Sequence, residues 1–395
     1  MPALTMGGTA ATTNKNRGGG SAASAAAVVP FIRASAQHRE PAGIDVSRQI
    51  TLADQDLGVF DIPAYGYVRS LLILVQATGG SGTSVVQAED GPFNALKNIF
   101  LTEPNGAFIA AFNWGYECYL ADKWGGLRDP AGSDMRQSPV YSAVASATGN
   151  FAFMLRVPVE INLRDGLGSL PNQNAAATFK LRLTLSSGAA NAGAYGATVP
   201  TTQPTVRVRV FLEAWDQPEA ATAGASNQVT PPAMNTTQFW SVQSFNVNAG
   251  SQNIRFTRVG NYLRNLIMVY RRTGSPPSRA NGQGDFPDPM TLYLDTRPLD
   301  IVEKNNFTHQ MFERTGFGGT LNATVPAYDS PGGLDNGVFV YDFTNEFDGL
   351  LGRENRDLWL PTLGSTRLEI QGSFANAGTL TVLTNDVAIA GNVFI

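Results

Sequence analysis

The chain has 395 residues, a formal net charge of −4, 43% hydrophobic residues and only 15% charged residues. Soluble domains carry about 25% charged residues, so much of the surface must be neutral and polar, or covered by neighbouring molecules. A single cysteine, Cys118, excludes an internal disulfide framework, and two histidines leave little for histidine-based metal chemistry. The length predicts two or three domains within a globular protein.

Residues 1–43 are predicted to form a flexible basic N-terminal arm. Nineteen of the first thirty residues are Ala, Gly, Ser or Thr, and such a segment buries too little apolar surface to offset its ordering entropy. All the charged residues before Glu40 are basic, and they are the candidate contacts with a neighbour or a membrane: Lys15, Arg17, Arg33 and Arg39. The apolar stretch at 22–29 is too short and too weakly apolar for a signal peptide, so we expect none.

From Ile44 the first half mostly alternates between apolar and polar residues, which is typical of half-buried antiparallel strands. The exception is 108–120, where Phe108, Phe112 and later apolar residues recur every four positions, and this spacing predicts a helix. Strands resume with clear alternation at 178–185 and at 205–213.

A stretch rich in Ala, Thr and Pro at 217–238 is predicted to be a linker between two domains. In the second half, Pro298 is well placed as a first-turn residue of a helix over 298–314, which Gly316 would end. The alternating residues at 367–371 predict a strand late in the chain.

The two halves are related by an internal repeat. Residues 67–79 align without gaps on 262–274, with five identities, among them Arg69 with Arg264, and five exchanges of one apolar residue for another. The order of strands around this segment then recurs in both halves. We therefore predict an all-β chain of two tandem eight-stranded jelly rolls at 44–216 and 239–395, each with one inserted helix.

The sequence carries no recognisable catalytic or metal-binding motif, so it predicts no catalytic residue, no cofactor and no metal site. Cys118 lies among apolar neighbours, and no histidine is near it in the sequence. His309 falls late in the second expected helix, where a structural role is favoured. Three pairs of neighbouring carboxylates lie in turn-like contexts, where Asp commonly bonds its own backbone: Asp54 with Asp56, Glu89 with Asp90, and Asp285 with Asp288.

One motif carries a resemblance to a known family. Residues 90–100 read Asp-Gly-Pro-Phe-Asn-Ala-Leu-Lys-Asn-Ile-Phe, and an aromatic segment containing Trp114 follows them. With the tandem halves, this motif resembles the double jelly-roll major capsid proteins of tectivirus-like, membrane-containing icosahedral phages. The motif covers about twenty residues, and the architecture covers about 350.

The resemblance implies a non-enzymatic structural subunit of the virion. Its homotrimer would form a pseudo-hexameric capsomer of an icosahedral shell, with penton and minor capsid proteins as further partners and no specific nucleic acid. An internal membrane would lie beneath the shell and meet the arm. The family's arms can form an amphipathic helix, whereas residues 1–30 lack an apolar face.

Two other classes remain open from the sequence. A carbohydrate-binding or carbohydrate-cleaving jelly-roll protein would need aromatic and carboxylate side chains clustered on one concave face. Another virion protein, such as a spike, would be β-rich and trimeric but would usually show fibrous repeats. Glycan binding would favour the first alternative, and an elongated trimer would favour the second.

Overall fold

The structure, a computed structural model, describes residues 37–125, 142–161, 166–216, 236–279, 282–306, 335–344 and 356–389. Lys15, Arg17, Arg33 and His309 lie outside these residues, as do 217–235 of the expected linker. No helix in the described part of the chain is long and apolar enough to cross a bilayer.

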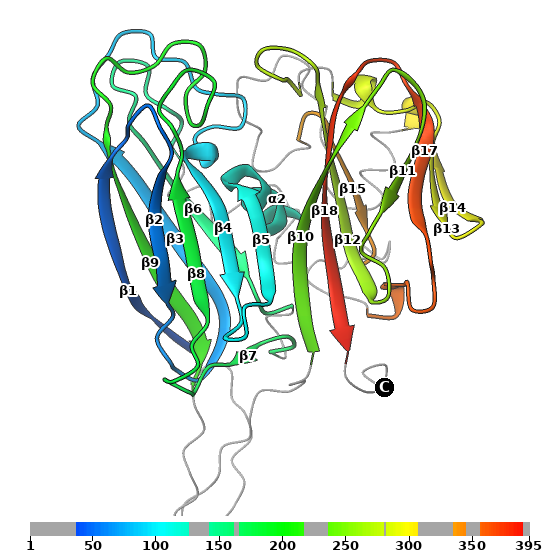
Figure 1. The fold of residues 1–395 in the computed structure, drawn as a ribbon, viewed down its shortest axis with the longest axis horizontal. Coiled ribbons are helices and arrows are strands. Elements are labelled where there is room, and N and C mark those ends of the chain that lie inside the picture. Colours follow the sequence, from blue (N-terminus) through cyan, green and yellow to red (C-terminus); the bar gives the residue numbers. More distant parts are fainter. Residues whose placement is uncertain are drawn as a thin grey trace, which may run out of the picture. The chain divides into compact units, whose positions relative to one another are not determined.

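The first half forms two antiparallel sheets (Figure 1). The strands of the first, called the β1 sheet, are in order β1 (Gln37–Gln49), β9 (Thr205–Trp215), β3 (Tyr67–Thr78) and β6 (Phe151–Pro158), with β7 (Leu170–Pro171) also paired to β3. The strands of the second, called the β2 sheet, are β2 (Gln55–Asp61), β8 (Lys180–Leu185), β4 (Leu96–Thr102) and β5 (Phe108–Trp114). Each sheet pairs strands that are distant in the sequence, which is the jelly-roll arrangement.

The second half repeats this order of strands. Its β10 sheet contains β10 (Thr236–Val247), β18 (Gly378–Ile389), β12 (Tyr262–Arg272) and β15 (Val338–Asp342), with β16 (Leu360–Pro361) paired to β12. Its β11 sheet contains β11 (Gly250–Phe256), β17 (Leu368–Phe374), β13 (Met290–Leu294) and β14 (Arg297–Val302). The prediction of two tandem eight-stranded jelly rolls is confirmed.

The predicted strand faces are confirmed by burial. On β8, Leu181, Leu183 and Leu185 are buried between the sheets, while Lys180 and Arg182 are exposed. The even-numbered residues of β9 from Val206 to Leu212 are likewise buried. Each such side chain contributes about 1.5–3 kcal/mol by leaving water, so the alternation itself stabilises the sandwich.

The sequence repeat is also a structural repeat. β3 and β12 hold the same place in their sheets, and both ladders slip by one residue at the repeated arginine, Arg69 in one and Arg264 in the other. The extra residue forms a β-bulge, and its presence at the same position in both halves makes the bulge a shared feature of the two rolls.

Both helix predictions need correction. Residues 108–114 form β5, and the helix α2 begins only at Gly115 and runs to Trp124. The expected helix at 298–314 begins instead as β14, followed by the short 3₁₀ helix η3 (Lys304–Asn306), and 307–314 lie outside the described residues. A spacing of four residues returns to the same face in a strand as well as in a helix, so it does not distinguish the two.

Short 3₁₀ helices complete the described elements: η1 (Phe93–Ala95), η2 (Gly282–Asp285) and η4 (Arg356–Leu358). The strand β1 begins at Gln37, so the arm ends before Gly43, and β10 begins at Thr236, within the expected linker. Arg39, expected in the arm, is therefore a residue of the first strand.

Candidate functional site

The two rolls meet along the edges of two sheets. The last strand of the β2 sheet, β5, pairs in parallel with β10 at Ala110 and Trp240, and this pairing joins the β2 and β10 sheets. The ring of Phe112 lies 6.1 Å from the indole of Trp240. The amide of Gln238 donates to the carbonyl oxygens of Val159 and Glu160, at 3.0 and 3.1 Å. Strand pairing, an aromatic contact and hydrogen bonds to backbone carbonyl oxygens therefore connect the two rolls.

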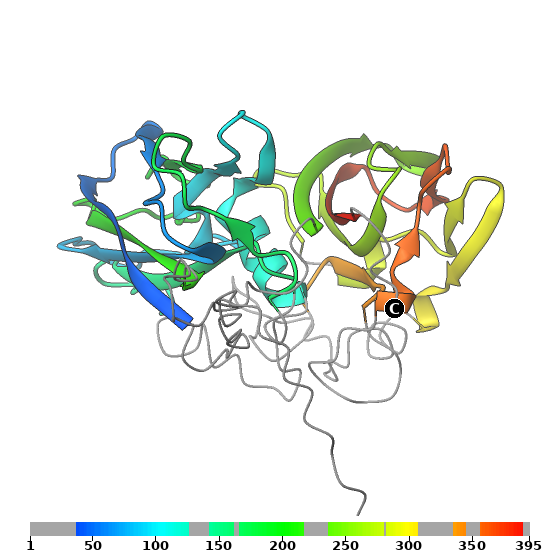
Figure 2. The ribbon, with the colours of Figure 1, turned by 90° about the horizontal axis from the view of Figure 1, so that it is seen from below.

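The helix α2 lies between the rolls (Figures 1 and 2), and a buried ion pair holds it to the second roll. Lys123 Nζ donates to Asp335 Oδ1 at 2.7 Å, and both side chains are 0% exposed. Trp124 Nε1 donates to the other carboxylate oxygen at 2.9 Å. Removing one partner of such a pair typically costs 3–5 kcal/mol, so this contact fixes the position of the helix.

The bulge arginine of the second roll also reaches α2. Arg264 is fully buried and donates to Gln238 Oε1 at 3.0 Å and to Asn385 Oδ1 at 2.6 Å. Its Nη2 donates to the carbonyl oxygen of Gly125, directly after the helix, at 3.4 Å. Carbonyls at a helix C-terminus lack helical partners and carry partial negative charge, so a buried guanidinium is well placed there.

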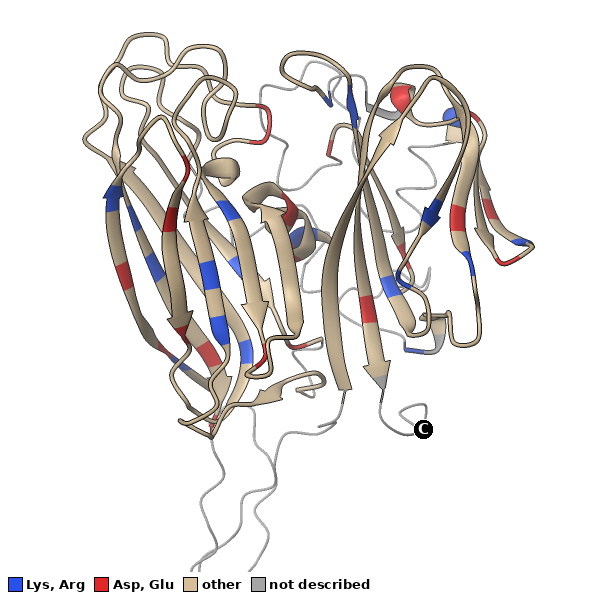
Figure 3. Ribbon diagram, in the orientation of Figure 1, with Lys and Arg blue, Asp and Glu red and all other residues tan. Residues whose placement is uncertain are grey.

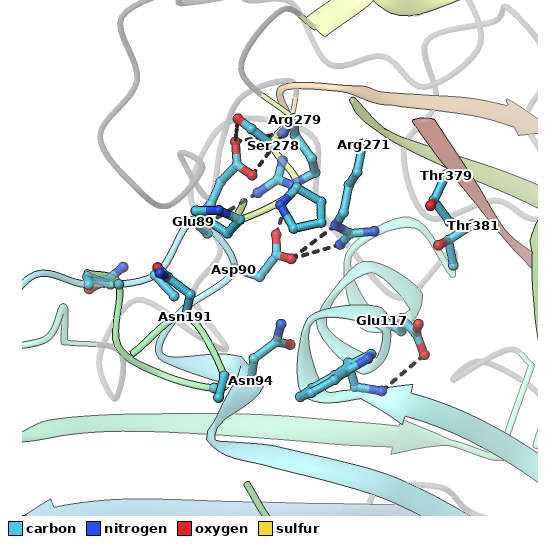
Figure 4. Close-up of a pocket in the computed structure, with 18 of the residues that line it drawn as sticks. Glu89, Asp90, Asn94, Glu117, Asn191, Arg271, Ser278, Arg279, Thr379 and Thr381 are labelled. Carbon is cyan, nitrogen blue, oxygen red and sulfur yellow. Dashed lines mark hydrogen bonds and ion pairs between the residues drawn. The ribbon is translucent and has the colours of Figure 1, made fainter. Parts of the chain in front are cut away.

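The Asp-Gly-Pro-Phe-Asn motif lies at a cavity of about 670 Å³ lined by both rolls (Figure 4). Asp90 accepts hydrogen bonds from Arg271 Nη2 and from Arg279 Nε, both at 2.8 Å. Its neighbour Glu89 accepts from the backbone N–H of Arg279, at 2.9 and 2.8 Å to its two oxygens, and from the Ser278 hydroxyl at 3.2 Å. The motif therefore binds the first roll to the loop that follows β12.

These arginines set the charge state of Asp90. Burial alone would raise the pKa of this carboxyl, but the guanidinium groups of Arg271 and Arg279 outweigh burial and hold its pKa below the usual range. Asp90 is therefore a permanent anion near neutral pH. Its carboxylate therefore connects the first roll to Arg271 and Arg279 of the second roll through ion pairs.

Glu117 behaves differently on the same cavity. Burial raises the pKa of its carboxyl to about 7, although the backbone N–H groups of Trp114 and Asn113, which donate to Oε2 at 3.1 and 2.6 Å, oppose this. Glu117 thus caps the start of α2 and titrates near neutrality.

The remaining candidates from the sequence have structural roles. Burial raises the pKa of the Cys118 thiol, and its Sγ donates to the carbonyl oxygen of Arg156 at 3.3 Å. Asp54 pairs with Lys97, Asp56 with Arg182, and Asp285 with Arg272. Arg39 pairs with Glu213. In the described ranges, no group of three or more His, Cys, Asp or Glu residues is arranged to hold a metal ion.

No protein-family model matches the sequence, and no curated protein matches it. Solved structures match its fold. The major capsid protein of Sulfolobus Turreted Icosahedral Virus superposes with a TM-score of 0.56 at 13% identity, covering 89% of this chain and 97% of that chain. The major capsid protein P2 of bacteriophage PM2 gives 0.51 at 9% identity, covering 90% and 99%. A PBCV-1 virus capsid chain gives 0.52 at 10% identity, covering 89% and 93%.

The fold is therefore the double jelly roll of viral major capsid proteins, matched over 89–90% of the chain. The expected likeness to that class is confirmed, and the matched structures extend beyond the phages that the motif suggested.

Proposed function

We propose that this chain is the major capsid protein of an icosahedral virus and acts as a structural subunit rather than an enzyme. The observation that carries the proposal is the joining of two rolls of identical strand order, edge to edge, in one chain. Such a chain offers two similar building blocks, so a few copies can surround an axis with nearly equivalent contacts.

The chemistry of the surface supports a packing role. Charges of both signs are spread over the strands, and neutral residues separate them (Figure 3). Interfaces between proteins are depleted of charged residues at their centres, and only 15% of this chain is charged. Of the neighbouring carboxylates in the sequence, Asp54, Asp56, Asp90 and Asp285 are engaged in ion pairs within the fold. Glu89 and Asp288 accept hydrogen bonds from backbone N–H groups.

The finer arrangement is part of the proposal. Three copies form a pseudo-hexameric capsomer, and capsomers tile the shell of the virion beside penton and minor capsid proteins. The basic residues Lys15, Arg17 and Arg33 of the arm face a neighbouring subunit or the anionic head groups of an internal membrane. Each basic residue near such a surface contributes about 1 kcal/mol.

Solution mass tests the proposal directly. Light scattering on a sizing column should give three times the chain mass of 42.1 kDa, about 126 kDa, with a compact radius. Electron microscopy of the same material at high concentration should show capsomers or shells. A monomer of 42.1 kDa at every concentration would contradict the proposal, and glycan binding by that monomer would favour the carbohydrate-active alternative.

A further inference from the structure

The cavity beside the Asp-Gly-Pro-Phe-Asn motif has the size and the access of a small-molecule site. Its volume of about 670 Å³ lies within the range of about 300–1,000 Å³ that such sites occupy. It is open to solvent, because three of the residues that line it are exposed: Asn113, Asn191 and Ser244. Both rolls line it, so a ligand there would contact both halves of the chain.

Several polar groups of the cavity wall have hydrogen-bonding capacity that the fold leaves unused. Glu117 is only 4% exposed, and its Oε2 accepts from two backbone N–H groups, while no described group donates to its Oε1. Arg271 donates to Asp90 through Nε and Nη2, and its Nη1 has no partner among the residues that the structure describes. Asn94 accepts from the Tyr116 N–H through Oδ1, and its Nδ2 donates to no group in the described ranges. A carboxyl, a guanidinium and an amide therefore remain available to a ligand.

The second roll adds a row of hydroxyl groups to the same wall. On β18, Thr379 lies opposite Arg271 of β12. Two residues further along β18, Thr381 lies opposite Ser244 of β10, and their hydroxyl oxygens are 3.5 Å apart. Figure 4 shows the guanidinium of Arg271 between Asp90 and the two threonines. Because a hydroxyl both donates and accepts, this wall suits a ligand that carries hydroxyl groups itself.

The charges at the cavity favour an uncharged ligand. The guanidinium groups of Arg271 and Arg279 both donate to Asp90, and Glu89 accepts from the backbone of Arg279 beside them. An anionic ligand would therefore meet arginines that are already paired. A cation at Glu117 would lie near Arg271, whose charge acts on that carboxyl. Because burial raises the pKa of Glu117 to about 7, its carboxyl can donate or accept near neutral pH.

We propose that this cavity binds a neutral oligosaccharide. A neutral sugar carries many hydroxyl groups and no charge, which matches the carboxyl, guanidinium, amide and hydroxyl groups of the wall. Trp114 also lines the cavity, and the negative π face of an indole attracts the C–H groups on the apolar side of a sugar ring. The site goes beyond the proposed function, since a structural subunit needs no ligand.

Binding without cleavage is expected at this site. Hydrolysis of a glycosidic bond needs two carboxyl groups that flank the bond. Of the three carboxyl residues that line the cavity, Asp90 is held by two guanidinium groups, and both oxygens of Glu89 accept from the Arg279 N–H. Glu117 is left without a second carboxyl group to work with it.

Saturation-transfer NMR on the wild-type protein in its associated state tests the site. The probes are the neutral saccharides lactose, maltotriose and N,N′-diacetylchitobiose, with inorganic phosphate and spermidine as charged comparisons whose binding is measured by calorimetry. We expect at least one neutral saccharide to bind at millimolar concentration, and neither charged probe to bind.

Variants of the hydroxyl row locate the binding. Thr379→Val combined with Thr381→Val removes two hydroxyl groups while preserving side-chain shape, and it should raise the dissociation constant of the saccharide about tenfold or more. Ser244→Ala, at an exposed position with little risk to the fold, should raise it about threefold. The matched control is Thr291→Val on β13, a half-buried threonine that does not line the cavity, and it should leave the dissociation constant unchanged.

The opposite results would overturn the inference. These are no binding of any neutral saccharide probe, equal affinity in the wild type and the hydroxyl variants, or binding of phosphate or spermidine alone. Light scattering on the same samples separates this inference from the proposed function. A trimer that binds no saccharide contradicts only the site, whereas a monomer that binds one contradicts only the proposed function.

Discussion

Lys123→Met is the sharpest perturbation of the junction between the rolls. It removes the ammonium group that donates to Asp335 at 2.7 Å in a position with no exposed side-chain surface. The carboxylate of Asp335 then stays buried, with the Trp124 N–H still donating to it. Breaking a buried pair in this way costs about 3–5 kcal/mol. At about 2–4 °C per kcal/mol for domains of this size, the melting temperature should fall by about 6–20 °C.

A matched control and a second substitution separate charge burial from lost packing. Lys97→Met breaks the more exposed pair with Asp54, with side chains 20% and 45% exposed, and should cost about 0–1 kcal/mol. Adding Asp335→Asn to Lys123→Met removes the uncompensated charge but keeps an oxygen for Trp124. The double variant should therefore be more stable than Lys123→Met alone, by about 1–3 kcal/mol.

Urea unfolding and thermal unfolding followed by circular dichroism measure both differences. A loss of stability in Lys123→Met no larger than in Lys97→Met would contradict the role assigned to the buried ion pair. A further loss of stability on adding Asp335→Asn to Lys123→Met would contradict the cost assigned to the unpaired carboxylate.

Three other outcomes follow from the structure. The pKa of Glu117 is raised from 4.5 to about 7. The stability that its protonated form contributes is therefore complete below pH 4.5 and is lost as the pH rises through 7. Over this range the wild type should lose up to about 3 kcal/mol of unfolding free energy relative to Glu117→Gln, as measured by urea unfolding at each pH. Equal pH dependence of the two proteins would contradict this. Gly66→Ala should be strongly destabilising, because φ is +46° and a Cβ would lie 1.9 Å from the carbonyl oxygen of Trp215. Gly106→Ala is the control: at φ +88° with nothing within 4 Å of the added Cβ, it should cost only about 1 kcal/mol. Similar melting temperatures for the two variants would count against the close approach at Gly66. Deleting residues 2–30 should leave soluble trimers intact but reduce their flotation with anionic liposomes, and unchanged flotation would exclude a membrane role of the arm.

The strands were predictable because their signal is local. The alternation of apolar and polar residues at 178–185 and 205–213 indicates which residues are buried, and the sheets bury those residues. The repeat was predictable because duplication preserved the residues of β3 and β12. The helices were placed wrongly because a period of four fits either secondary structure. Of the residues in that pattern, Phe112 is buried, whereas Phe108 is 54% exposed.

The junction was only partly predictable. The motif at 90–100 is recognisable in the sequence, but the partners of Asp90, Arg271 and Arg279, lie 181 and 189 residues away. No local pattern encodes such a pairing. Lys123 and Asp335 are separated by 212 residues and carried no signal of their own. The one available signal was the arginine shared by both repeats, Arg69 and Arg264, since a charged residue inside an apolar run demands a buried partner.

The two rolls diverge most where their environments differ most. At the internal junction the contact between Phe112 and Trp240 forms once, during folding, and never faces water again, so aromatic side chains stabilise it at no risk of aggregation. On the outer end strand β1, the ladder registers place Arg39 where the second roll has Trp240. The Arg39 side chain is 60% exposed and pairs with Glu213. A charged residue on an end strand opposes indiscriminate pairing with other chains. The duplicated fold thus has an apolar contact at its internal junction and a charged residue at the equivalent place on its outer margin.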